Sequence, residues 1–249
     1  MTPEAIQAAN RRLQSAAPLD IIRWAISEAG GRAVVSTNFR PYEAVLLHLV
    51  TRVQPEIPVL WVDHGYNRPA TYRHAEELRR RLNLTLQAYV PAMTAARYDA
   101  LHGGPPDPTP TNEDRLQAFS RVMKLEPFQR GMRILAPQVW FAALRKVQNP
   151  NRAGLDIVSP DTNFGVLKVC PLFHWSDAEM ESYLRQHELP NEWDYFDPAK
   201  ADEKRECGLH AAWGARAHGV EALNRGSVEK ADDGTTAQEG RRKRKMRTG

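Results

Sequence analysis

The stretch RAVVSTNFRPYEAVLLHLVTRVQPEIPVLWVD, residues 32–63, decides the fold. It begins with a short apolar run and continues through the polar loop TNFRP into a helix with a strong apolar face. It ends in a second apolar run that stops at an acid. Both runs are continuously apolar rather than alternating, which is typical of parallel strands covered on both faces. The stretch therefore predicts a strand–helix–strand unit of a parallel sheet.

The flanking sequence extends this unit in both directions. We expect helices in residues 3–17, 18–30, 69–83, 126–135 and 176–189, the last with a capping box of Ser176 and Glu179. We expect further strands in residues 84–90, 138–144 and 164–172. Glycine and proline cluster at residues 103–110, which predicts a mobile loop.

These elements predict an α/β protein with an open, mostly parallel twisted sheet flanked by helices. Apolar periodicity is lost after about residue 218. We therefore expect one domain in residues 1–218 and a disordered basic tail in residues 219–249.

The composition narrows the class of protein. The chain has 249 residues and two cysteines, too few for a disulfide framework, a typical iron–sulfur cluster or a cysteine-only zinc site. No apolar run is long enough to span a membrane, and the N-terminus lacks the apolar segment of a signal peptide. We expect a cytoplasmic protein with no bound metal or cofactor.

The net charge of +4 belongs to the C-terminus, where RRKRKMR (residues 241–247) carries six basic residues. The rest of the chain is close to neutral. The run indicates either nucleic-acid or partner binding, or a solvated end, and we favour the solvated end.

In an open parallel sheet, ligands bind beyond the carboxyl ends of the strands. The first such loop offers Ser36, Thr37 and Asn38 at the start of a helix, where backbone N–H groups and a hydroxyl suit an anion. A plain strand-to-helix turn explains this loop equally well. After the second strand, Asp63 is suited to a hydroxyl or amino group and Tyr66 to a base, with a capped turn as the alternative.

Positive charge gathers after the predicted strand at residues 138–144. Arg145 and Arg152 lie there, and Lys124 adds to them from an earlier segment. Guanidinium groups match phosphate or sulfate oxygens well. This position directly after an apolar strand favours a ligand-binding role over a merely solvated face.

The segment KRECGLH surrounds one of the two cysteines, Cys207. The thiolate is the nucleophilic form of cysteine, and cations at Lys204, Arg205 and His210 favour that form. The pattern is compatible with a nucleophile, but by itself it favours a non-catalytic thiol, because such local patterns do not transfer freely between families. The other cysteine, Cys170, lies in an apolar run and is expected to be an inert core thiol.

Taken together, these segments resemble the phosphoadenosine phosphosulfate (PAPS) reductases. The similarity runs through residues 47–84, KLEP, WFAALRKVQNPNRA and LKVCPLFHW, in that order, and ends with ECGLH, where the family carries its catalytic cysteine. The resemblance implies an adenine-nucleotide alpha-hydrolase-like fold and a sulfonucleotide substrate.

The resemblance also implies a mechanism and its partners. Cys207 would attack the sulfur of PAPS, adenosine 3′,5′-bisphosphate would leave, and thioredoxin or glutaredoxin would release sulfite from the S-sulfocysteine, as in assimilatory sulfate reduction. A homodimer is common in such enzymes. The implied substrate contacts are Ser36, Thr37, Asn38, Asp63, Lys124, Arg145, Arg152, Lys204, Arg205 and His210.

Three departures from the family pattern leave alternatives open. Arg40 stands where the family has a glycine, so it either binds phosphate or blocks the usual pose. His64 replaces a threonine, and the segment between Trp193 and Cys207 is short. The alternatives are a diverged paralogue acting on adenosine phosphosulfate (APS) or another adenylylated substrate, and a non-enzymatic nucleotide- or nucleic-acid-binding subunit.

Overall fold

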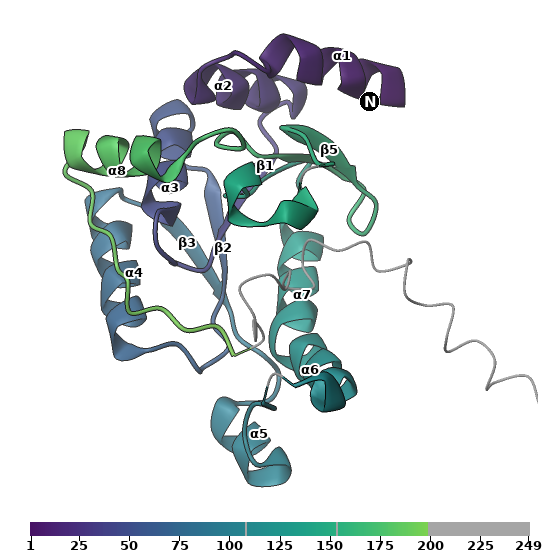
Figure 1. Ribbon diagram of the computed structural model, residues 1–249, viewed down its shortest axis with the longest axis vertical. Coiled ribbons are helices and arrows are strands. Elements are labelled where there is room, and N and C mark those ends of the chain that lie inside the picture. Colours follow the sequence, from purple (N-terminus) through teal and green to yellow (C-terminus); the bar gives the residue numbers. More distant parts are fainter. Residues whose placement is uncertain (108, 153, 199–249) are drawn as a thin grey trace, which may run out of the picture. The chain divides into compact units, whose positions relative to one another are not determined.

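A computed structural model describes residues 1–198 except for 108 and 153. In this part of the chain, six strands form one sheet in the order β3-β2-β1-β4-β6-β5 (Figure 1). All neighbouring strands are parallel except β5 and β6, which are antiparallel. The strands are β1 (Ala33–Thr37), β2 (Pro58–Val62), β3 (Thr85–Tyr89), β4 (Val139–Phe141), β5 (Val158–Asp161) and β6 (Val166–Val169).

Helices flank this sheet. They are α1 (Pro3–Leu13), α2 (Pro18–Glu28), α3 (Glu43–Val53), α4 (Pro69–Arg81), α5 (Ala95–His102), α6 (Glu113–Ser120), α7 (Glu126–Leu135) and α8 (Asp177–Gln186). A π-helix, η2 (Arg121–Leu125), joins α6 to α7, and three 3-10 turns are η1 (Pro110–Asn112), η3 (Lys146–Gln148) and η4 (Pro150–Arg152). The predicted open, mostly parallel α/β sheet is confirmed. The predicted domain end at residue 218 and the basic tail lie outside the described residues.

Local sequence explains where most of these helices begin. Proline occupies the first turn of α1, α2 and α4, where a missing N–H leaves no helical hydrogen bond unmade. The predicted capping box of α8 is present, with Ser176 and Glu179 each bonded to the other's backbone N–H. Such caps are readable from a few adjacent residues.

Two predictions of local structure were incomplete. Helices α5 and α6 flank the predicted loop at residues 103–110, and strand β5 was missed. Helix α5 buries only Tyr98, so it has no apolar periodicity to detect. Strand β5 contains Pro160 and lies at the sheet edge, where the side-chain amide of Asn10 bonds both backbone groups of Val158, at 2.8 and 2.9 Å.

The order of the strands places the ligand-binding edge. Strand β1 pairs with β2 on one side and with β4 on the other. The chain moves outward from β1 through β2 to β3 and then returns to β4, so the topological switch point lies between β1 and β4. A crevice is expected beyond the carboxyl ends of these two strands. Among the described residues, no helix is long and apolar enough to cross a membrane.

Candidate functional site

The loop after β1 is organised by Glu43, in the first turn of α3. Its Oε2 accepts hydrogen bonds from the Thr37 hydroxyl and the Asn38 N–H, both at 2.7 Å, and its Oε1 accepts from Arg40 Nε at 2.9 Å. The residue is 7% exposed. A carboxylate of the protein itself therefore holds the donors that were expected to meet a substrate anion.

Replacing Glu43 with alanine is expected to lower the free energy of unfolding by about 2–3 kcal/mol, because the Thr37 and Asn38 donors lose a charged acceptor. Urea denaturation measures this. Glu76→Ala is the control, because it removes only an exposed ion pair and should lower the free energy of unfolding far less. Equal losses in the two variants would contradict the role assigned to Glu43.

The side chain of Ser36, on β1, is bonded to Trp140 of the neighbouring strand β4 at the switch point. Trp140 Nε1 donates to Ser36 Oγ at 2.8 Å, and Lys168 Nζ lies 5.2 Å from the centre of the Trp140 ring. Trp140 is fully buried and Lys168 is 7% exposed. The hydroxyl of Ser36 therefore has a fixed donor, and its own proton is directed elsewhere.

The turn after β2 is built around Asp63. Its Oδ1 accepts from the Gly65 N–H at 3.0 Å and from the Tyr72 hydroxyl at 2.7 Å. Burial, followed by the hydrogen bond to Asp63, raises the pKa of Tyr72 to about 12. Gly65 has φ +78°, a conformation that favours glycine. Tyr66, expected to face a base, instead donates to Asp99 at 2.6 Å and packs near Phe119.

His64 is buried at the same turn. Its Nδ1 accepts the Tyr66 N–H at 3.1 Å, so the neutral ring carries its proton on Nε2. Burial, and then the nearby Lys124 ammonium, lower the pKa of His64 to about 4. The ring is therefore neutral near pH 7 and offers an Nε2–H group rather than a positive charge.

The pKa of His64 predicts a pH effect on stability. Between the ordinary histidine pKa of about 6.5 and pH 4, the unfolded chain binds a proton that the folded protein does not, so stability falls with falling pH by up to about 1.4 kcal/mol per pH unit. His64→Asn should reduce this slope. The slope that remains comes partly from His48 and His74, whose pKa values burial also lowers.

Urea titrations at a series of pH values measure the slope. His174→Asn, at an exposed position, is the control. A slope between pH 6.5 and 4 that His64→Asn leaves unchanged would contradict the prediction.

Lys124 lies in the π-helix η2, a rare element that is frequent at functional sites. Its Nζ donates to Asp197 Oδ2 at 2.5 Å, and the two side chains are 3% and 5% exposed. Lys124 also lowers the pKa of His64, and Asp197 raises it. One cation and one carboxylate, far apart in sequence, thus share a buried site with a neutral histidine.

The carboxylate of Asp197 arrives on an extended segment, residues 190–198, which we call the strap. Asn191 Oδ1 accepts the Tyr42 N–H at 2.8 Å, just before α3, and Asp194 pairs with Arg68, just before α4. These helices follow β1 and β2, so their first turns lie at the carboxyl ends of those strands. The strap therefore passes along the edge where a ligand is expected (Figure 1).

Comparison with known proteins identifies the family. The sequence profile of the phosphoadenosine phosphosulfate reductase domain matches residues 32–193. The chain belongs to the phosphoadenosine phosphosulfate reductase family. Two relatives carry the name phosphoadenosine 5′-phosphosulfate reductase. The one from Synechococcus sp. is 34% identical to this chain, and the match covers 81% of this chain and 95% of the relative. The one from Alkalilimnicola ehrlichii is 36% identical, and the match covers 76% of each sequence. The resemblance inferred from the sequence is confirmed.

A solved structure has the same fold as this chain. The crystal structure of PAPS reductase from Candida auris, a phosphate complex, matches with a TM-score of 0.66 at 21% identity. The match covers 77% of this chain and 89% of that chain. Since the profile match begins next to β1 and ends within the strap, the family region includes the loops after β1, β2 and β4.

The two arginines expected to bind substrate in this reductase-family chain are held by protein groups. Arg145 is 2% exposed; it donates to Asp177 Oδ1 at 2.6 Å and to the Trp175 carbonyl at 3.1 Å, and its guanidinium lies 5.3 Å from the centre of the Tyr42 ring. Arg152 donates to Gln148 at 2.6 Å. Arg145 thereby fixes the start of α8, the helix that precedes the strap.

Four of the predicted site residues, Lys204, Arg205, Cys207 and His210, lie outside the described residues. Their roles stay predictions. The other cysteine, Cys170, is 2% exposed, and burial raises its pKa to about 11. It therefore remains a thiol near neutral pH, as expected of core packing.

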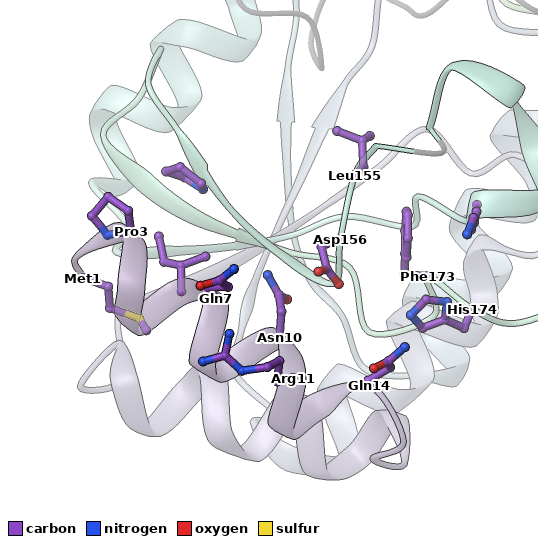
Figure 2. Close-up of a pocket in the computed structure, with 13 residues that line it drawn as sticks. Met1, Pro3, Gln7, Asn10, Arg11, Gln14, Leu155, Asp156, Phe173 and His174 are labelled. Atoms are coloured by element: carbon purple, nitrogen blue, oxygen red, sulfur yellow. The ribbon is translucent and has the colours of Figure 1, made fainter.

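A separate pocket lies beside α1 (Figure 2). It has a volume of about 680 Å³ and is lined by α1 side chains together with Asp156, Phe173 and His174, among others. None of the predicted substrate contacts lines it. Within the described ranges, no group of three or more histidine, cysteine or acidic side chains could hold a metal ion.

The structure places Ser36, Thr37 and Asn38 at the carboxyl end of β1 and Asp63 at that of β2. Lys124 lies near the turn after β2, where it lowers the pKa of His64. The roles of these residues in substrate binding stay predictions. Sequence reasoning missed the acids that engage this edge, Glu43, Asp177 and Asp197. Glu43 gave a local signal, an acid in the first turn of a helix. Asp197 gave none, because its partner is distant in the chain.

Proposed function

We propose that this protein reduces PAPS to sulfite and adenosine 3′,5′-bisphosphate. The observation that carries the proposal is the family match over residues 32–193, with reductases of that name 34–36% identical to the chain. The proposed enzyme is an oxidoreductase acting on a sulfur group. The topological switch point between β1 and β4 supports it, since nucleotides bind at such switch points.

In the proposed reaction, the thiolate of Cys207 attacks the sulfur of PAPS. The sulfur–oxygen bond breaks, its electron pair leaves with adenosine 3′,5′-bisphosphate, and S-sulfocysteine forms. A thiolate of thioredoxin or glutaredoxin then attacks Sγ of Cys207, and sulfite leaves. The second thiol of the reductant resolves the mixed disulfide, so the reductant supplies two electrons.

The described residues supply the groups that such a step needs. Charge accumulates on the leaving phosphate, and a buried ammonium such as that of Lys124 stabilises it strongly. The Ser36 hydroxyl, which accepts from Trp140, donates to a substrate oxygen. The neutral His64 adds an Nε2–H donor without a second positive charge.

Intact-mass spectrometry of the reduced protein after mixing with PAPS tests the proposal. We expect a sulfonate adduct on Cys207 that thioredoxin discharges as sulfite. A Cys170→Ser variant should form the same adduct, because Cys170 is buried. A free, reactive Cys207 that takes no adduct from PAPS would overturn the proposal.

One observation favours a second candidate substrate. The Glu43 carboxylate already holds the Thr37 and Asn38 donors, so the loop after β1 offers less to a phosphate than the sequence suggested. APS or another sulfonucleotide with less negative charge is therefore the alternative. An adduct formed from APS and not from PAPS would identify it. The external reductant, the homodimer and the cytoplasmic location stay predictions.

A further inference from the structure

The Lys124–Asp197 pair has an unusual placement for a structural ion pair. Both side chains are nearly inaccessible to water, and the pair joins the π-helix to the strap rather than two elements of the core. Removing two charges from water carries a large desolvation cost, so a buried pair is weak evidence for a stabilising role. The placement of the pair therefore favours a role in binding over a role in stability.

The chemistry of the pair suggests that role. A carboxylate offers an ammonium the same kind of oxygen acceptor as a phosphate or sulfate does, in a site that is already dehydrated. Lys124 is one of the predicted substrate contacts, and it is close enough to the buried His64 ring to lower its pKa. Asp197 thus lies where an oxyanion would bind.

Several of the contacts that hold the strap lie at the surface and can exchange. Of residues 190–198, only Asp197 and Pro198 are buried, whereas the rings of Trp193 and Phe196 contact the Tyr42 ring and the Arg68 guanidinium at the surface. Trp193 and Phe196 are 64% and 44% exposed. The ion pair between Arg68 and Asp194 is about half exposed on each side. Segments with few buried apolar contacts open at low free-energy cost.

We propose that Asp197 is an internal occupant of an oxyanion site, and that the substrate's phosphate or sulfate displaces it from Lys124 and frees the strap. This inference rests on the proposed function and adds to it a coupling between binding and movement. In the sequence, the strap precedes the segment that carries Cys207.

Calorimetry with adenosine 3′,5′-bisphosphate tests the inference in the full-length protein. Asp197→Asn removes the competing charge, so the variant should bind adenosine 3′,5′-bisphosphate with a dissociation constant about tenfold lower than that of the wild type. Asp194→Asn is the matched control, because it removes one carboxylate from the strap but none from Lys124. It should change the dissociation constant by less than about twofold. Asp197→Glu, which keeps the charge, should restore weaker binding.

Hydrogen exchange supplies a readout that does not depend on turnover. In the wild type, amide exchange in residues 190–198 should become faster when the nucleotide binds. In Asp197→Asn, exchange in the same residues should already be this fast without the nucleotide. If Asp197→Asn binds the nucleotide no more tightly than the wild type, or if both strap variants bind it equally tightly, the inference is overturned.

Inorganic phosphate as a second ligand separates this inference from the proposed function. If the inference holds but the function is wrong, Asp197→Asn still binds phosphate more tightly, while the nucleotide binds no better than phosphate. If the function holds but the inference is wrong, the nucleotide binds the wild type and Asp197→Asn alike.

Discussion

Sulfite formation from PAPS is expected to fall by more than about a thousandfold when Cys207 is replaced with serine, because a hydroxyl is a far poorer nucleophile toward sulfur than a thiolate. Binding of adenosine 3′,5′-bisphosphate should remain within about twofold of the wild type, since the substitution changes one atom and no charged group that holds the nucleotide. A coupled assay for sulfite and calorimetry measure the two quantities separately.

Cys170→Ser is the matched control for this prediction. Cys170 is buried, with a pKa of about 11, so its replacement should leave sulfite formation within about twofold of the wild type, apart from any loss of stability. If sulfite formation survives in Cys207→Ser and is lost in Cys170→Ser, the nucleophile is Cys170, and the proposed mechanism is contradicted.

Replacing Lys124 with methionine is expected to lower the free energy of unfolding by about 3–5 kcal/mol, because it removes the ammonium that the buried Asp197 carboxylate contacts at 2.5 Å. Nucleotide binding should weaken at least about tenfold, since a contact with a charged group is lost and a negative charge remains beside the site. Urea denaturation and calorimetry give the two values.

The double variant Lys124→Met, Asp197→Leu separates structure from function. Two apolar side chains in place of the buried pair should recover most of the stability, since such replacements are often neutral. They should not recover nucleotide binding, because the cation is still absent. Recovery of both would show that Lys124 is only a structural partner of Asp197.

Local sequence was sufficient for much of the fold. Continuous apolar runs predicted β1 and β2, and both are buried on their two faces. The capping box of α8 marks a helix start because its hydrogen bonds span only three residues. The prolines of the first helical turns mark helix starts because their missing N–H leaves no helical hydrogen bond unmade. Strand β5 was not predicted from the sequence, because its pairing depends on β6 and on Asn10, which lies 148 residues from Val158.

In the candidate site, too, some features could be predicted from the sequence and others depend on the tertiary structure. The sequence by itself determined which loops end at the ligand edge and which cations lie in them, since parallel strands bring their carboxyl ends together. Only the tertiary structure decided what those groups bind. Glu43 holds the first loop, Asp177 holds Arg145, and Asp197 reaches Lys124 across 73 residues. A buried charge requires a partner, and the fold, rather than the spacing in the chain, selects it.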